Sequence, residues 1–74
     1  MVGMTVKLLR AERRITRGQL AGLAKVDRNT VGRIERGDGN VGIDVLDNLA
    51  QGFGMTTWEL LRAVVYYAHT LKYL

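Results

Sequence analysis

The chain has 74 residues, a net charge of +4 and no cysteine, serine or proline, which predicts one small domain over residues 1–74. This composition excludes disulfides, thiolate metal sites and a Ser or Cys nucleophile, and it disfavours a metal site built from His69 and carboxylates, so we expect no metal, no cofactor and no enzymatic activity. No signal peptide is recognisable and the longest apolar run, residues 63–67, cannot span a bilayer, so we expect a cytoplasmic protein without membrane contact.

Five helices are predicted by one repeated pattern. An apolar residue, a helix cap and a second apolar residue five positions after the first form a hydrophobic staple. The pattern occurs at Met4–Thr5–Leu9, Ile15–Thr16–Leu20, Val26–Asp27–Val31, Val41–Gly42–Leu46 and Met55–Thr56–Leu60. It predicts helices over residues 6–14, 17–24, 28–36, 43–53 and 57–72. No strand pattern competes, so the predicted fold class is all-α.

Local signals strengthen several of these helix boundaries. Thr16 with Gln19 and Thr56 with Glu59 form full capping boxes, and Gly37 stands where a helix should end in the left-handed conformation. The apolar periodicity then predicts one core. Its expected members are Val6, Leu9, Leu20, Ala21, Ala24, Val26, Val31, Ile34, Ile43, Leu46, Leu49, Ala50, Phe53, Leu60 and Val64.

Positive charge is concentrated in the first half of the chain. Residues 1–36 carry nine Lys and Arg against three acidic residues, whereas residues 37–74 carry two against four. This asymmetry favours a surface that faces a polyanion and a separate second surface.

The third predicted helix has two contrasting faces. At about 100° per residue, Val31 and Ile34 lie on one side. The opposite side carries Arg28, Asn29, Gly32, Arg33 and Arg36. Arg can donate two hydrogen bonds to guanine, and Asn can pair with adenine. The glycine either lets the helix approach DNA closely or packs against the preceding helix. Together with the short helix before it, this pattern predicts a helix-turn-helix over residues 16–37 that inserts its second helix in the DNA major groove.

The segments LLRAERRITRGQLA, VDRNTVGRIERG and GIDVLDNLAQGFGMTTWELL resemble the Cro/phage-repressor helix-turn-helix family, also called the Xre family, over about residues 5–61. The resemblance implies a five-helix repressor-like DNA-binding domain, here with an extended C-terminal helix. The implied base-reading residues are Arg28, Asn29 and Arg33. The implied phosphate-binding residues are Thr16, Arg17, Arg36 and Asn40. Arg10 and Glu35 match a family pair that forms a partly buried structural salt bridge.

The chain departs from the family pattern at three positions near the expected interface. Arg17 stands where the family often has Gln. Lys25 stands where the turn usually has Gly, so either this lysine adopts a positive φ or the turn differs. Asp38 adds a negative charge beside the expected path of the phosphates.

The predicted helix 57–72 offers a second surface for dimerisation. One apolar stripe comprises Leu60, Val64, Tyr67 and Leu71, and the other comprises Trp58, Leu61, Val65 and Ala68. A domain of this size can bury one stripe fully, so we expect the Trp58 stripe to form a homodimer interface with Tyr66 and Tyr73 at its rim. The alternative is that both stripes are buried within the monomer.

These features predict sequence-specific binding of double-stranded DNA by a homodimeric transcriptional regulator: a repressor, controller or autoregulator on an inverted-repeat operator. The expected setting is bacterial or phage-encoded and nucleoid-associated. The run RIERGDGN leans towards the controller proteins of restriction–modification systems by resemblance. The alternative is a protein-interaction module or antitoxin whose apolar C-terminal helix binds a partner protein such as a toxin.

Overall fold

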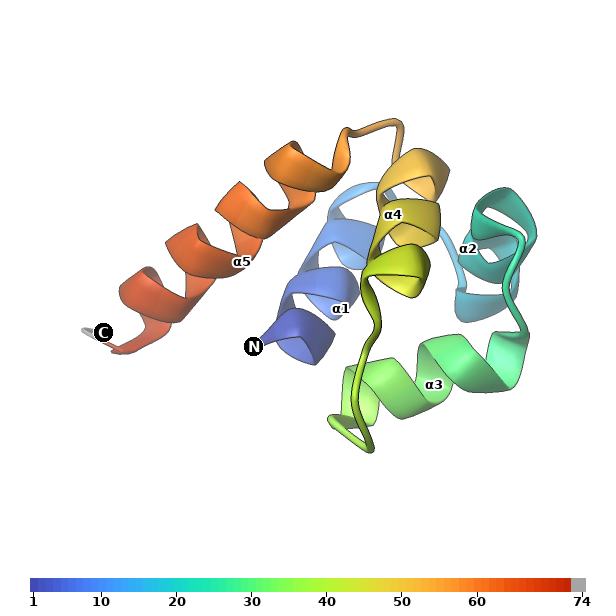
Figure 1. Cartoon of the computed structure of the whole chain (residues 1–74), viewed down its shortest axis with the longest axis horizontal. Helices are drawn as coiled ribbons and strands as arrows, with labels where there is room; N and C mark the ends of the chain where they lie inside the picture. Colours follow the sequence, from blue (N-terminus) through green and yellow to red (C-terminus); the bar gives the residue numbers. More distant parts are fainter. Residues whose placement is uncertain (73–74) are drawn as a thin grey trace.

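The computed structural model of the protein describes residues 1–72 as five helices joined by short connections (Figure 1). The helices are α1 (Val2–Glu12), α2 (Arg17–Ala24), α3 (Arg28–Arg36), α4 (Ile43–Gly52) and α5 (Thr57–Lys72). No strand forms within residues 1–72, so the predicted all-α class is confirmed. Tyr73, expected at the rim of an interface, lies outside the described residues.

Helix α1 begins four residues earlier than predicted, and the role expected for Thr5 as its cap is wrong. Thr5 lies inside the helix, fully buried, and its hydroxyl donates to the carbonyl oxygen of Met1 at 2.8 Å. The physical reason is a tertiary contact that the local pattern does not encode. A Cβ at Gly3 would collide with the carbonyl oxygen of Ile34, so the glycine lets this first turn pack directly against the end of α3.

Helix α1 also ends two residues before the predicted residue 14, at Glu12. The predicted boundaries of the other four helices agree with the structure to within one residue, and the caps of α2 and α5 show why. The Thr16 hydroxyl accepts from the Gln19 backbone N–H at 3.0 Å, and the Gln19 side chain accepts from the Thr16 N–H at 2.8 Å. Thr56 and Glu59 repeat this capping box at the start of α5. These reciprocal bonds satisfy backbone donors that a helix start leaves without partners.

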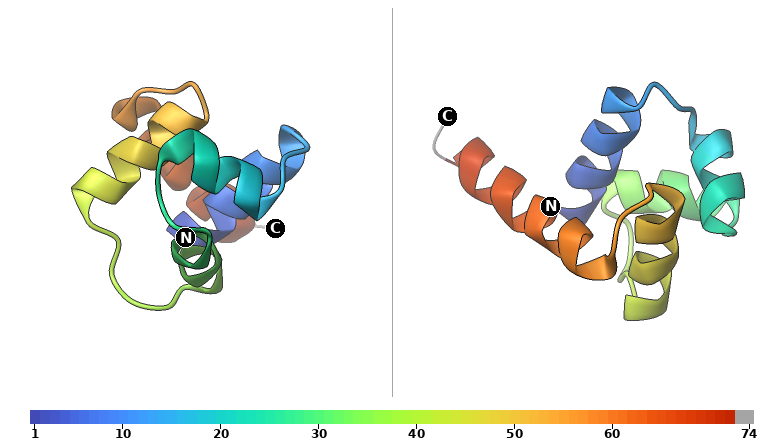
Figure 2. Two further views of the ribbon diagram at one scale, coloured as in Figure 1. Left: turned by 90° about the vertical axis from the view of Figure 1, so that its right-hand side faces the viewer. Right: turned by 90° about the horizontal axis from the view of Figure 1, so that it is seen from above.

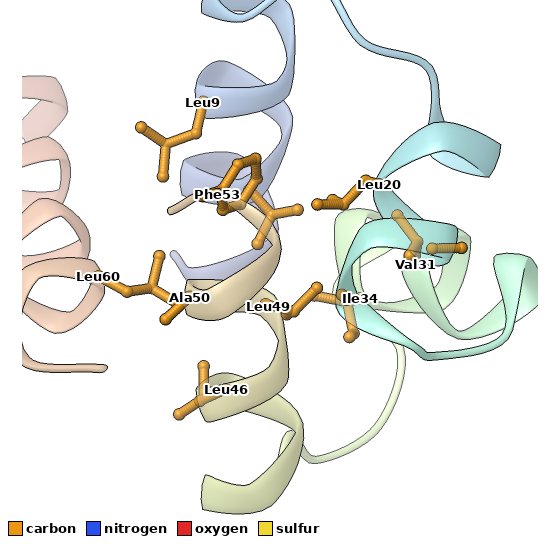
Figure 3. Close-up of a cluster of buried hydrophobic side chains, with 12 residues drawn as sticks. Leu9, Leu20, Val31, Ile34, Leu46, Leu49, Ala50, Phe53 and Leu60 are labelled. Atoms are coloured by element: carbon orange, nitrogen blue, oxygen red, sulfur yellow. The ribbon is translucent and has the colours of Figure 1, made fainter. Parts of the chain in front are cut away.

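A single apolar core lies where the helices meet (Figure 3). Its twelve buried residues are Val6, Leu9, Leu20, Ala21, Ala24, Val31, Ile34, Leu46, Leu49, Ala50, Phe53 and Leu60. All twelve were predicted, but three further predicted members are not buried. Ile43 is 66% exposed because it begins α4 ahead of the turns that pack, and Val26 and Val64 are only half-buried.

The helices are arranged so that α3 and α5 lie on different sides of the molecule. Helix α2 packs against α3 and α4, α1 packs against α3, and α5 packs against α4 and α1. Helix α5 draws away from the rest of the molecule towards its C-terminal end, and it lies at the opposite end of the long axis from α2 (Figures 1 and 2). The fold thus separates the basic helix-turn-helix from the apolar C-terminal helix.

Candidate nucleic-acid interface

Helices α2 and α3 are joined by a tight turn over residues 25–27 and pack against each other. Lys25 ends α2 in the left-handed conformation, with φ 57°, so this lysine occupies the position that the family usually gives to glycine. A non-glycine residue pays about 1–2 kcal/mol for that conformation. Asp27 then begins α3 by accepting from the Asn29 backbone N–H at 2.7 Å. The predicted helix-turn-helix is therefore present at residues 16–37.

Helix α3 buries one face and exposes the other. Val31 and Ile34 belong to the core, which fixes the helix against α1 and α2. The exposed residues are Arg28, Asn29, Arg33 and Arg36. The helix ends at Gly37, which adopts the left-handed conformation with φ 76°. The exposed side presents three cations and one amide on a rigid element.

The cationic face of α3 and the start of α2 enclose a hollow of about 270 Å³, which we call the arginine hollow. It is lined by Arg17, Arg28, Asn29, Gly32, Arg33 and Arg36. All three predicted base-reading residues and two of the four predicted phosphate-binding residues therefore meet at one place. The lining contains four arginine side chains and no acidic residue, so positive charge is concentrated at this place.

The remaining two predicted phosphate-binding residues lie beside the arginine hollow. Asn40 follows α3 and lines a second hollow of about 340 Å³, which shares Arg33 with the first. Thr16 lines neither hollow and is occupied as the cap of α2. Of these two residues, only Asn40 therefore lies in a hollow that adjoins the exposed face of α3.

Gly32 forms part of the wall of the arginine hollow. A Cβ at this position would lie 3.3 Å from Nη1 of Arg36, and no atom of α2 lies within 4 Å of it. The glycine therefore does not serve to pack α3 against the preceding helix. Gly32 is itself buried, and its lack of a side chain leaves room for the guanidinium of Arg36.

A buried carboxylate lies behind the arginine hollow. The Glu35 side chain is 1% exposed and accepts from Nε of Arg10 at 2.8 Å and from Nη2 of Arg10 at 3.2 Å. Burial raises the pKa of Glu35, but the hydrogen bonds and charges of Arg10 and Arg17 outweigh burial, so the net pKa of Glu35 lies below its ordinary range. Glu35 is thus held as a carboxylate that ties α3 to α1.

Arg17 also binds Glu35, a contact that the sequence did not predict. Nε of Arg17 donates to Oε1 of Glu35 at 3.0 Å. The two residues are separated by most of two helices, and they meet only because α2 and α3 pack together. The one available signal was the arginine itself, which replaces the Gln that the family often has there.

Arg36 has a carboxylate partner of its own. Its Nε donates to Oδ2 of Asp38 at 3.1 Å, and both side chains are more than half exposed. An exposed pair of this kind contributes little to stability, about 0–1 kcal/mol. It orients the Arg36 guanidinium near Gly32, and a stronger anion can displace it.

Helix α5 exposes an apolar surface far from the arginine hollow. Trp58 and Val65 are 67% and 68% exposed, whereas Leu61 and Ala68 are half-buried. A shallow hollow of about 280 Å³ lies between Trp58, Leu61, Arg62 and Val65. We call the apolar surface formed by Trp58, Leu61, Val65 and Ala68 the Trp58 surface.

Residues 1–72 hold neither a membrane-spanning helix nor a cluster of metal ligands. No helix there combines the length and apolar character needed to cross a membrane. In the same residues no three His, Cys, Asp or Glu side chains are grouped so as to hold a metal ion.

Comparison with known proteins places these features in a family. A family model described as a helix-turn-helix domain matches residues 2–64. The restriction-modification controller protein C.AhdI from Aeromonas hydrophila is 32% identical, with 80% of this chain and 89% of that chain covered and a TM-score of 0.75. The wild-type restriction-modification controller protein C.Esp1396I is 25% identical, with 88% and 83% covered and a TM-score of 0.79. Among curated proteins no match was found.

The resemblance drawn from the sequence is therefore confirmed over most of the chain. The protein belongs to the helix-turn-helix family of non-enzymatic, DNA-binding transcriptional regulators.

Proposed function

We propose that the protein is a homodimeric regulator that binds an inverted-repeat operator, of the controller type found in restriction–modification systems. The arginine hollow on the exposed face of α3 is the observation that carries this proposal, because it joins base-reading and phosphate-binding groups on one rigid surface. The similarity to C.AhdI, a restriction-modification controller protein, supports the controller role over the other regulator roles.

In this proposal the residues of the interface divide into two groups. Arg28, Asn29 and Arg33 read base edges in the major groove, where bidentate donors discriminate guanine and adenine. The phosphate-binding residues are Thr16, Arg17, Arg36 and Asn40. They set the register of α3 on the duplex and supply affinity that depends on salt.

The Trp58 surface supports the homodimer. It combines a large exposed aromatic residue with aliphatic neighbours on a helix that stands away from the body. A second copy that covers Trp58, Leu61, Val65 and Ala68 would place two α3 helices about one DNA turn, roughly 34 Å, apart. An inverted repeat is the operator symmetry that matches such a dimer.

The proposal is tested by selection of binding sites from a random duplex library at about 150 mM salt, where weak non-specific binding is suppressed. We expect enrichment of an inverted repeat with half-sites about one helical turn apart. A folded protein that enriches no sequence would contradict the proposal. That outcome would favour a module whose Trp58 surface binds another protein.

A further inference from the structure

The guanidinium of Arg17 is hydrogen-bonded to the protein through Nε, which leaves its terminal nitrogens for other acceptors. Its Nε donates to Glu35, and within residues 1–72 its two terminal nitrogens have no hydrogen-bond partner. The side chain is 42% exposed and lines the arginine hollow, so the terminal nitrogens are available to a ligand there. A guanidinium can bind a carboxylate through Nε and still donate two hydrogen bonds from its terminal nitrogens.

Arg10 plays a different part on the same carboxylate. It uses Nε and Nη2 on Glu35 and Nη1 on the carbonyl oxygen of Ile15 at 3.1 Å, and its side chain is only 19% exposed. Arg10 therefore holds Glu35 in place and does not itself line the arginine hollow. Arg17 is the member of this trio that faces outward.

The chemistry of the arginine hollow selects the ligand. Its lining holds four guanidinium groups, of which Arg17 and Arg36 each pair with one carboxylate. Two positive charges therefore remain without a carboxylate partner within residues 1–72, and a bound anion would balance them. Arginine side chains match the oxygens of a phosphate with paired hydrogen bonds. A phosphodiester group fits these requirements and is present at every step of a duplex.

We propose that Glu35 is a positioning residue that aims Arg17 at one phosphate of the DNA backbone beside α3. The inference rests on the proposed function. Because Glu35 lies on α3 and Arg17 on α2, the ion pair fixes the phosphate contact of one helix relative to the base-reading side chains of the other. It also gives arginine a role at this position that a simple cation cannot fill. A lysine ammonium has all its donors on one nitrogen, so it cannot bind Glu35 through one nitrogen while other nitrogens point at the phosphate.

The test compares three variants on the selected operator at about 0.1 M salt. Arg17→Ala removes the group, and Arg17→Lys keeps the charge but loses the Nε contact. Arg13→Ala removes a positive charge just after the C-terminal end of α1, where Arg13 lies over the ring of Phe53, and serves as the control because Arg13 does not line the arginine hollow. We expect Arg17→Lys and Arg17→Ala to lose affinity alike, about tenfold, and to lower the salt slope by about one. Arg13→Ala should stay within about twofold of the wild type.

The same variants are then measured on duplexes in which single phosphates are replaced by neutral methylphosphonates. Wild type should lose about tenfold at one phosphate of each half-site, and both Arg17 variants should be insensitive at that phosphate. Glu35→Gln, where it folds, should show the same insensitivity. If Glu35→Gln does not fold, the comparison of Arg17→Lys with wild type at that phosphate decides alone.

Two outcomes separate this inference from the proposed function. If the wild type binds its operator and Arg17→Lys retains affinity within about twofold, Arg17 acts as a cation only and the positioning role of Glu35 is overturned. If the wild type has no preferred duplex at all, the proposed function is overturned and this inference with it.

Discussion

The side chains of the arginine hollow differ in how firmly the free protein holds them. Arg17 and Arg36 each have a carboxylate partner, whereas within residues 1–72 Arg28 has no hydrogen bond or ion pair and Arg33 reaches only the hydroxyl of Thr30 at 3.4 Å. The proposed phosphate-binding arginines are therefore preset, and the proposed base-reading arginines are free to adapt. Such a division suits a protein that first fixes its register on the backbone and then discriminates sequence.

Arg33→Ala tests the base-reading assignment. The arginine lines both hollows on the outer face of α3, and its removal leaves the core untouched. We expect a loss of about 1–3 kcal/mol on the selected operator and a relaxed preference at one base pair. Binding is measured against the selected site and its single-base variants, with Arg13→Ala as the charge-matched control. A uniform loss across all variants would reassign Arg33 to phosphate binding.

Glu35→Gln tests the buried carboxylate through pH. The folded-state pKa of Glu35 lies below the unfolded value, which is about 4.3, so its stabilisation is present above that value and is lost as pH falls through the folded pKa. We expect the variant to be less stable than wild type near neutral pH by about 1–3 kcal/mol, because Arg10 and Arg17 lose a charged acceptor. Urea unfolding from about pH 7 to about pH 3 should show this difference shrinking below about pH 4. A difference that does not change with pH would contradict the ionised state.

At the scale of the elements, the packing of α1 against α3 depends on a glycine, Gly3, at the point of contact. The first turn of α1 meets the last carbonyls of α3 at Gly3, which brings the N-terminal part of the chain against the reading helix. Gly3, Ile34 and Glu35 do not line the arginine hollow. The contact therefore supports α3 without forming part of its exposed cationic face.

Gly3→Ala should destabilise the protein, because its Cβ would collide with backbone rather than with a movable side chain. We expect a loss of about 1–3 kcal/mol in urea unfolding. Gly22→Ala is the matched control, since Gly22 lies inside α2 with open space around it. That substitution should stabilise by about 0.5–1 kcal/mol through helix propensity. Equal effects of the two changes would show that α1 does not depend on this close approach.

The elements also show where sequence reasoning succeeds and where it stops. The starts of α2, α3 and α5 are set by side chains within three residues of each cap, so local patterns predict them. Thr5 carries the same pattern, yet the contact of Gly3 with α3 extends the helix past it. The family resemblance implied the pair of Arg10 and Glu35, but the contact between Arg17 and Glu35 depends on how two helices pack in this chain. The sequence alone does not show which nitrogens of Arg17 remain free.

At the scale of the whole molecule, the arginine hollow and the Trp58 surface lie on different helices. The arginine hollow is formed by α2 and α3, and the Trp58 surface lies on α5, which draws away from the body (Figure 1). A partner on α5 therefore leaves the face of α3 accessible to DNA.

Val65→Glu tests the proposed dimer. Val65 is 68% exposed, so a carboxylate there should leave the monomer folded while placing a charge in the interface. We expect sedimentation to show a dimer for the wild type and a monomer for this variant. Leu23→Glu is the control, because Leu23 is 58% exposed but lies on α2 at the other end of the long axis. A wild-type monomer, or a dimer that survives Val65→Glu, would reject the Trp58 surface as the interface.

Because α5 lies at one end of the molecule, a small rotation at α5 in the proposed dimer changes the distance between the two DNA-binding faces. The distance between the two half-sites of the operator should change with it. The long dimension of the protein is 34 Å, so in the proposed dimer a rotation of about ten degrees at α5 would move the far end by about 6 Å. One base-pair step is about 3.4 Å, so that movement exceeds a full step. Substitutions on α5 that preserve the dimer but tilt its helices should therefore shift the preferred distance between half-sites, although they touch no DNA.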